Sequence, residues 1–338
     1  MDYQHKTTVF VTGATGYIAQ HIVSQLIEKG YKVVGSVTTK AKGEAMAKLV
    51  GPVNFKYEIV PDVTKPGAFI EALDKNQSAR YFIHTATPYT FNVNEEKNDE
   101  MLQKAIDSTK NVFKSIQYHG IQVRKVVLTS SMVAVAGFGP FFDPNKVYTE
   151  NDWNPISWDE SLEPANGYYG SKKFAELAAW EYWNKNKPYF KLTVINPVYV
   201  FGPQAFEFTD TSSLATSAEK VSYIANLSST DKIPEAYGRC IDVRDVARAH
   251  VLALENEETS NRRLLLVGGA FSNDKIAHII NQNFPNCNVP DGDLARDEEE
   301  MRQVHKIDDS NSKNVLGFEY IPLEKTITDS INQIYAGI

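Results

Sequence analysis

The chain has 338 residues and a net charge of −7, with 42% hydrophobic and 23% charged residues. This balance is typical of a folded protein with one large core or two modest ones. No basic stripe is present to suit the phosphates of a nucleic acid, and no apolar run approaches the roughly 18 residues of a membrane span. We therefore expect a small-molecule partner.

Cysteine use and the opening residues bear on the compartment. Only two cysteines occur, Cys240 and Cys287, and no positively charged segment followed by an apolar run opens the chain. Neither a disulfide framework nor secretion is therefore implied. The seven histidines show no metal-ligand spacing. We expect a protein of the reducing cytoplasm without a metal site.

The first predicted unit is a strand, a glycine turn and a helix. The β-rich run 7–12 ends at the segment GATGYIA (13–19), after which apolar residues recur at helical spacing. Gly13 permits the tight turn, and Gly16 lets a pyrophosphate approach the backbone N–H groups at the positive end of the helix. Ala19 replaces the third glycine of the fingerprint, a position that serves helix–strand packing. Because a second buried strand follows at 31–37, the pattern predicts dinucleotide binding.

The end of that second strand indicates which dinucleotide is bound. An acid there usually contacts the adenosine ribose of NAD, whereas a basic residue meets the 2′-phosphate of NADP. No carboxylate occurs between Gly35 and Glu44, while hydroxyls and the lysines Lys40 and Lys42 do. The alternative is an ordinary solvated helix start with a Thr as its cap. We favour NADP.

Further strands alternate with helices, which predicts a parallel, doubly wound sheet. The expected strands are 55–60, 79–85, 123–130 and 191–200. Since ligands gather at the carboxyl ends of such strands, Asp62 can meet the adenine, and His84, Thr85 and Ala86 lie on the cofactor-facing edge. His84 can equally be a hydrogen-bonded core histidine, which is the interpretation we prefer.

The apolar strand before Ser131 turns hydroxylic at its carboxyl end, so Ser131 is a candidate to hold a substrate oxygen. Serines at strand ends are also common turn formers. A loop punctuated by prolines follows, and we expect it to border the active site. Its prolines are Pro140, Pro144, Pro155 and Pro164.

Two Tyr–Lys pairs follow on a predicted helix. Tyr168 and Lys172 are four residues apart, as are Tyr169 and Lys173. On a helix this spacing places the Cβ atoms of each pair about 5–6 Å apart. At about 4 Å and an effective dielectric of about 20, an ammonium favours the phenolate by about 4 kcal/mol, up to about three pKa units. Such a phenol can act as an acid near neutral pH, but the spacing does not choose between the pairs, and chance produces such pairs in many proteins.

The clean alternation stops after residue 203. Helices are expected at 212–227, from near Asp242, at 273–283 and at 324–335, and a strand at 263–267; the acidic run 298–300 is interpreted as solvated. The fold class is therefore α/β: a Rossmann-type doubly wound parallel sheet with a smaller, interleaved C-terminal substrate lobe. The expected dinucleotide-binding domain is 1–200 with 238–268 returning to it, and the substrate lobe is 201–237 and 269–338.

Several stretches together carry a family resemblance: 12–23, 126–131, 168–176, 196–203 and 241–246. With them the chain resembles, over nearly its full length, an extended short-chain dehydrogenase/reductase. Within that family it is similar to the yeast methylglyoxal/aldehyde reductases related to plant dihydroflavonol 4-reductases.

The family's Tyr-x-x-Ser-Lys pattern falls on Tyr168, Ser171 and Lys172, and its catalytic serine on Ser131. The resemblance implies that Tyr168 donates a proton, that Lys172 lowers its pKa and holds the nicotinamide ribose, and that Ser131 binds the carbonyl oxygen. It implies an NADPH-dependent reductase that converts aldehydes, 2-oxoaldehydes such as methylglyoxal, and prochiral ketones to alcohols by hydride transfer.

The expected cofactor contacts are Gly13, Thr15, Gly16, Tyr17, Ile18, Thr38, Lys42, Asp62, Val63, Thr85, Ala86, Thr87, Tyr168, Lys172, Pro197 and Val200. NADP-preferring relatives commonly have an arginine where Thr38 stands, so 2′-phosphate recognition would fall on Lys42, Lys40 and the hydroxyls. The pocket is expected to be walled by apolar and aromatic side chains that follow strand ends, each of which can equally be ordinary core packing. They are Tyr89, Phe91, Met132, Tyr199 and Phe201.

Two other functions use such a scaffold. A nucleotide-sugar epimerase or dehydratase would hold NAD tightly, and the missing carboxylate near Val37 argues against it. A non-catalytic dinucleotide-sensing module need not keep Ser131, Tyr168 and Lys172. We expect a cytoplasmic enzyme that is a monomer or homodimer, takes a small carbonyl substrate, and has neither a nucleic-acid nor a membrane partner.

Overall fold

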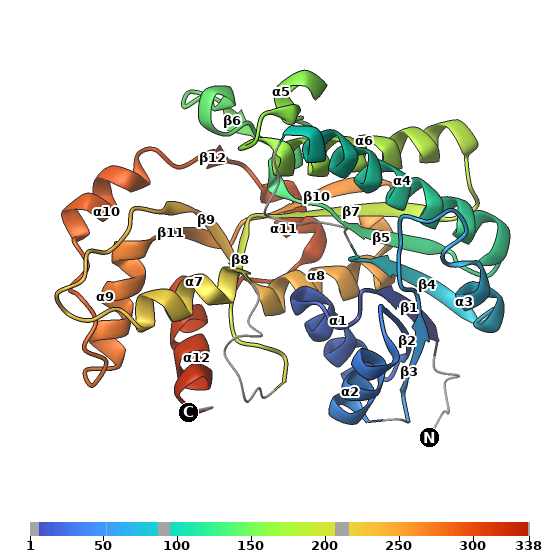
Figure 1. Cartoon of the computed structure of the whole chain (residues 1–338), viewed down its shortest axis with the longest axis horizontal. Coiled ribbons are helices and arrows are strands. Elements are labelled where there is room, and N and C mark those ends of the chain that lie inside the picture. The colour runs from blue at the N-terminus through green and yellow to red at the C-terminus, as the bar shows by residue number, and fades with distance from the viewer. Residues whose placement is uncertain (1–6, 52, 87–94, 207–215, 337–338) are drawn as a thin grey trace.

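The computed structural model describes residues 7–51, 53–86, 95–206 and 216–336. Its larger part is a seven-stranded sheet in the order β10-β7-β5-β4-β1-β2-β3 (Figure 1). All neighbouring pairs are parallel, which confirms the expected Rossmann-type fold class. The strands are β1 (Thr8–Thr12), β2 (Lys32–Val37), β3 (Phe55–Ile59), β4 (Ala79–His84), β5 (Lys125–Thr129), β7 (Lys191–Pro197) and β10 (Arg262–Leu266).

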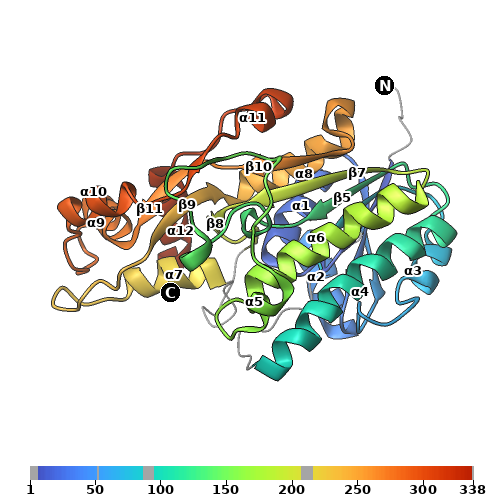
Figure 2. The same cartoon turned by 90° about the horizontal axis from the view of Figure 1, so that it is seen from above.

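Helices cover both faces of this sheet, which is why its strands are apolar on both sides. In β1, Val9 and Val11 face one buried cluster, and Phe10 faces the other. One face carries α1 (Tyr17–Glu28), α2 (Lys40–Val50), α8 (Val243–Glu255) and α11 (Ser310–Leu316). The other carries α3 (Ile70–Lys75), α4 (Glu95–His119) and α6 (Gly167–Asn186), and Figure 2 shows α4 and α6 side by side.

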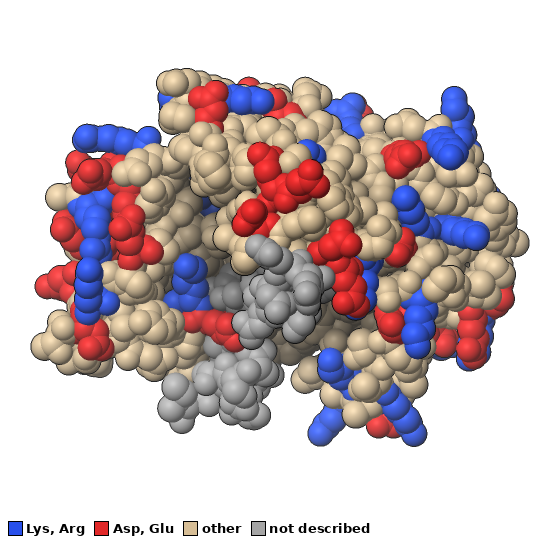
Figure 3. Space-filling view, turned by 45° about the horizontal axis from the view of Figure 1, so that its top comes forward, with Lys and Arg blue, Asp and Glu red and all other residues tan. Residues whose placement is uncertain are grey.

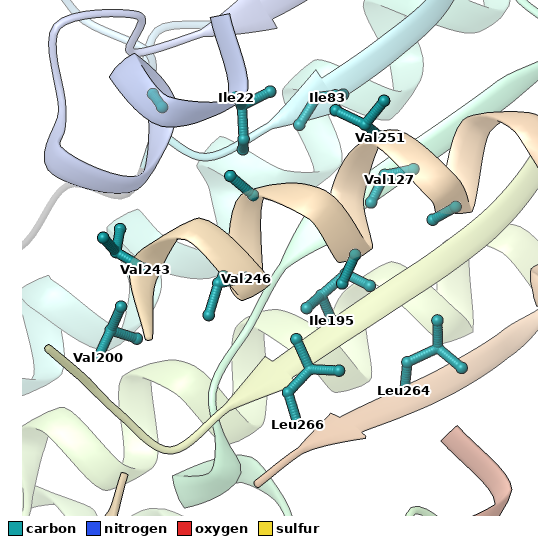
Figure 4. Packing of buried hydrophobic residues seen from close by; sticks show 14 of the residues in the cluster. Ile22, Ile83, Val127, Ile195, Val200, Val243, Val246, Val251, Leu264 and Leu266 are labelled. Carbon is teal, nitrogen blue, oxygen red and sulfur yellow. The ribbon is translucent and has the colours of Figure 1, made fainter. Parts of the chain in front are cut away.

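The first cluster joins distant parts of the chain. Ile22 of α1 and Val246 of α8 pack with Ile83 of β4 and Ile195 of β7, and all four are fully buried (Figure 4). α8 therefore belongs to the core of the large sheet, although it follows most of the sheet in sequence.

A smaller lobe lies beside the large sheet (Figure 1). Its sheet has the order β11-β9-β8, and its core includes Phe201, Phe271 and Ile331. The elements are β8 (Tyr199–Phe201), α7 (Thr216–Ala225), β9 (Tyr237–Asp242), β11 (Gly269–Ser272), α9 (Asn273–Asn283), α10 (Leu294–Met301) and α12 (Leu323–Ala336). The remaining elements are short: η1 (Met132–Ala134), η2 (Gly139–Phe141), β6 (Val147–Tyr148), α5 (Trp158–Leu162), η4 (Glu257–Thr259) and β12 (Lys306–Ile307).

The segment expected as one strand at 191–200 is two strands in different sheets. β7 ends at Pro197, which has no N–H to continue a ladder, and β8 pairs instead with β9. The chain thus enters the small sheet at β8, returns through α8 and β10, and leaves again at β11. The lobes interleave, while the division into domains at 200, 238 and 268 stays a prediction.

The acidic run near the C-terminus also differs from expectation. It lies in α10, where Glu298 and Glu299 are exposed as predicted. Glu300 is only 3% exposed, so the prediction is wrong for this residue. The reason is helical periodicity, which turns Glu300 inward where α10 packs on α9.

Candidate active site

The carboxyl ends of β1 and β4 are tied together at the point where the strand order reverses. Thr12 Oγ1 accepts hydrogen bonds from the N–H groups of Thr85 (3.0 Å) and Ala86 (3.1 Å) and lies 2.8 Å from His84 Nδ1. Because both N–H groups donate to it, the Thr12 hydroxyl hydrogen is left for His84. Burial lowers the pKa of His84 to about 3. His84 is therefore a neutral, hydrogen-bonded core histidine, which was the preferred interpretation.

The glycine loop leaves the start of α1 open to an anion. Gly13 has a φ of +60°, and a Cβ there would lie 3.3 Å from Ala86 Cα. The helix begins after Gly16 with no side-chain cap and no acidic residue in its first turn. Free N–H groups at a positive helix end suit a pyrophosphate. Ala19 is buried, as helix–strand packing requires.

At the adenosine end of the expected site the side chains are mostly solvated. Thr38 and Lys42 are exposed, Thr39 caps α2 by accepting from the Lys42 N–H (3.3 Å), and Lys40 pairs with Glu44 at 3.6 Å. These contacts are those of an ordinary helix start, and they leave Thr38 and the ammonium of Lys42 available.

The next expected contacts, Asp62 and Val63, are partly buried. Asp62 Oδ1 accepts from the N–H (2.9 Å) and the hydroxyl (2.6 Å) of Thr64, which lowers the pKa of Asp62. Asp62 is therefore a carboxylate turned toward its own loop.

The structure brings Tyr168 and Ser131 together. The two side chains are hydrogen-bonded, and Ser131 also caps η1 by accepting from the Val133 N–H (3.3 Å). Lys172 lies one helical turn beyond Tyr168. The competing pair points elsewhere: Tyr169 stacks on Phe138 with ring centroids 5.2 Å apart.

Close packing places the start of α6. A Cβ at Gly167 would lie 2.4 Å from Asn98 Oδ1, and one at Gly170 would lie 2.3 Å from Ser161 Cβ. Asn98 in turn donates to the carbonyls of residues 162 (3.0 Å) and 163 (2.9 Å). Glycine is therefore required at both positions for α6 to approach α4 and α5 this closely.

Burial dominates the electrostatics of the site. It raises the pKa of Tyr168, and the hydrogen bond with Ser131 opposes that rise. It also lowers the pKa of Lys172 to about 8, against the attraction of Glu176. The net lowering of the Tyr168 pKa expected from the Tyr–Lys spacing is therefore not found, because removing the phenolate from water raises the pKa more than the Ser131 hydrogen bond lowers it. At pH 7 the phenol keeps its proton.

The segment after β7 lies against the start of α1. Tyr17 donates its hydroxyl to the Gly202 carbonyl (2.6 Å), and His21 Nε2 lies 2.9 Å from the Pro203 carbonyl oxygen. Of the expected contacts here, Pro197 is buried and Val200 is 8% exposed. Hydrogen bonds thus join α1 directly to the segment that enters the small lobe.

The expected pocket residues divide into separate groups. Tyr199 is 50% exposed and acts electrostatically on Tyr168, so it borders the site. Met132 and Phe201 are 4% and 0% exposed and belong to core clusters, which favours the core-packing alternative for both. Thr87, Tyr89 and Phe91 lie outside the described residues.

Sequence reasoning missed the polar groups behind Lys172. Glu176 is buried and paired with Arg263, and it bonds Ser130 and Asn196. Its position four residues after Lys172, on the same helical face, was a signal in the sequence. Nothing in the sequence indicates its pairing with Arg263, which is 87 residues away.

On the face drawn in Figure 3, the described Lys and Arg side chains are interspersed with Asp and Glu. No helix within the described ranges is long and apolar enough to cross a membrane.

Comparison with known proteins adds sequence and structural relatives. The pattern of the NAD dependent epimerase/dehydratase family matches residues 9–268. The chain is 45% identical to the putative NADPH-dependent methylglyoxal reductase GRP2 of Candida albicans, over 97% of this chain and 98% of the relative. It is 39% identical to the NADPH-dependent methylglyoxal reductase GRE2 of Saccharomyces cerevisiae, over 97% and 98% of the two chains. The crystal structure of Gre2 from Candida albicans in complex with NADPH superimposes with a TM-score of 0.92 at 45% identity, covering 98% of this chain and 99% of that chain.

Proposed function

Because the chain belongs to the NAD dependent epimerase/dehydratase family, we propose that it is an NADPH-dependent reductase of aldehydes, 2-oxoaldehydes such as methylglyoxal, and prochiral ketones. One observation carries the proposal, which is the hydrogen bond between Ser131 and Tyr168. Lys172 follows Tyr168 by one helical turn, and the glycine loop with the uncapped start of α1 follows a neighbouring strand end. The names of the relatives, which are NADPH-dependent methylglyoxal reductases, support both the cofactor and the substrate class.

The residues present suit a bound dinucleotide phosphate. The uncapped start of α1 offers N–H groups to the pyrophosphate, while Thr38 and Lys42, both exposed, can meet the 2′-phosphate. No carboxylate occurs between Val37 and Lys42 to repel it. When bound, NADPH supplies the hydride that reduces the carbonyl carbon.

The chain's own groups handle the oxygen atom of the substrate. The Ser131 hydroxyl donates a hydrogen bond to the carbonyl oxygen, and Tyr168 gives that oxygen its phenolic proton, a contribution typically of about 10²–10⁴-fold. Lys172 holds the nicotinamide ribose, and its ammonium stabilises the phenolate left on Tyr168. We place this reaction in the cytoplasm, in a monomer or homodimer.

The test is a screen of NADPH and NADH consumption with methylglyoxal, other aldehydes, diketones and prochiral ketones, and with UDP-sugars as the contrasting class. We expect turnover of the carbonyl compounds with a preference for NADPH. Conversion of UDP-sugars without net cofactor consumption, together with no reduction of the carbonyls, would assign the chain to the epimerases.

A further inference from the structure

The Glu176 carboxylate is a buried charge beside the proposed catalytic groups. Its side chain has no exposed surface, and it accepts hydrogen bonds from four side chains. These are Ser130 Oγ (2.5 Å), Asn196 Nδ2 (2.6 Å), Arg263 Nε (2.6 Å) and Trp180 Nε1 (3.3 Å). A buried carboxylate without partners would be costly, and these four donors satisfy its two oxygens.

Arg263 supplies the compensating charge from β10. Its side chain is 8% exposed, its guanidinium carbon lies 3.9 Å from the centroid of the Trp153 ring, and Nη1 donates to the Glu150 carbonyl at 2.9 Å. These contacts hold the guanidinium at Oε1 of Glu176, while Oε2 accepts from Ser130 and Asn196. The carboxylate can therefore act on a second cation.

That second cation is Lys172, one helical turn before Glu176. Both residues line one hollow between α4, α6 and the ends of β4 and β5. The only other titratable group lining this hollow among the described residues is His84, which is neutral at pH 7. The remaining lining residues are Ala, Ser, Thr and Leu, which carry no charge. Glu176 is thus the negative charge that faces Lys172 here, while Tyr168 precedes Lys172 on α6.

The same carboxylate reaches Ser131 through two intermediates. Ser130 bonds it directly, and Asn196, which bonds it at 2.6 Å, also donates to the Ser131 carbonyl at 3.1 Å. One buried group is therefore linked through Ser130 and Asn196 to the segment that carries the serine, and it lines the same hollow as the lysine.

We infer that Glu176 is a positioning residue, whose carboxylate holds the turn at residues 130–131 in place and keeps Lys172 as an ammonium. The inference rests on the proposed function for the roles of Ser131 and Lys172. Because the Glu176 side chain has no exposed surface, we assign it a role that acts through its neighbours.

The test measures the titration of Lys172 directly. NMR of protein labelled with ¹³C-lysine follows the Lys172 signal, which is assigned by its loss in Lys172→Arg. Glu176→Gln keeps the shape of the side chain but removes its charge. Because that change leaves Arg263 buried without a counter-ion, the variant Glu176→Gln/Arg263→Met provides a neutral pair of similar volume. Glu181→Gln, an exposed change on the same helix, is the matched control, and Glu176→Asp retains the charge.

In Glu176→Gln and in the double variant, we expect Lys172 to lose its proton at a pH about one to three units lower than in the parent. The alkaline limb of kcat/KM should move by the same amount, while Glu181→Gln leaves both unchanged and Glu176→Asp stays near the parent. If Lys172 titrated at the parental pH in folded Glu176→Gln or in the folded double variant, the inference would be overturned. A loss of kcat by the same factor at every pH would likewise overturn it, because it would show a merely structural role. The NMR reading needs no turnover, so absence of reductase activity in the parent would count against the proposed function alone.

Discussion

Replacing Tyr168 by Phe removes one hydroxyl from the site and leaves the ring. The hydroxyl is hydrogen-bonded to Ser131, but Ser131 keeps its bond to the Val133 N–H. The cost to the free energy of unfolding should therefore be about 1 kcal/mol or less. The loss of the proton donor should lower kcat by about 10²–10⁴-fold, equivalent to about 2.7–5.5 kcal/mol of transition-state stabilisation.

Tyr169→Phe is the matched control because it removes the same atom one residue further along. Its ring stacks on Phe138 with an angle of 11° between the planes, and a phenylalanine keeps that contact. Its stability and kcat should change by about 0.5 kcal/mol or less.

The assay combines kcat for methylglyoxal with NADPH, the Kd of NADPH by fluorescence titration, and the Tm. For Tyr168→Phe we expect a collapse of kcat with Kd and Tm nearly unchanged. If Tyr169→Phe lost activity and Tyr168→Phe kept it, the reasoning would be refuted, and the catalytic pair would be Tyr169 and Lys173.

Three further outcomes follow from the geometry of the cofactor site and of Lys172. The kcat/KM for NADPH should fall about tenfold between about pH 7 and pH 9, because Lys172, with a pKa of about 8, loses its charge in the free enzyme. A flat pH profile of kcat/KM would contradict this. The preference for NADPH should weaken with salt and should increase in Thr38→Arg, whereas equal kcat/KM for NADH and NADPH in the parent would reject the assignment of the 2′-phosphate site. Gly35→Ala would place a Cβ 2.6 Å from Ala14 Cβ and 2.9 Å from the Phe55 ring, so Tm and NADPH affinity should both drop, with overpacking costing about 1–3 kcal/mol; an unchanged Tm would exclude the clash.

The parts of this protein that sequence predicts well depend on neighbours in the chain. Gly13 and Gly16 mark a turn because their backbone conformation and close approach are local requirements. The alternation of strands and helices is also a local pattern, and it predicts the parallel sheet. The break at Pro197 is not predicted because β-forming residues stand on both sides of it, and only the pairing of β8 with β9 shows that β7 ends there.

The parts that sequence does not predict depend on burial and on distant partners. Helical spacing does not distinguish Tyr168 from Tyr169 as the proton donor. Their environments differ because Tyr168 is hydrogen-bonded to Ser131 and Tyr169 stacks on Phe138. The sign of the Tyr168 pKa shift follows from burial, which no spacing reveals. Phe201 follows a strand end as a pocket residue would, but it is covered by Phe271, with ring centroids 4.8 Å apart.

The interleaving of the two lobes has a consequence for the order in which the protein is made. Residues 243–266 contain α8, which covers α1 and the adjoining strands, and β10, which pairs with the outer edge of β7. Until this segment leaves the ribosome, the nascent chain carries an apolar face and an unpaired strand edge, both of which favour aggregation. The dinucleotide site is therefore completed late in synthesis, although its glycine loop is made long before.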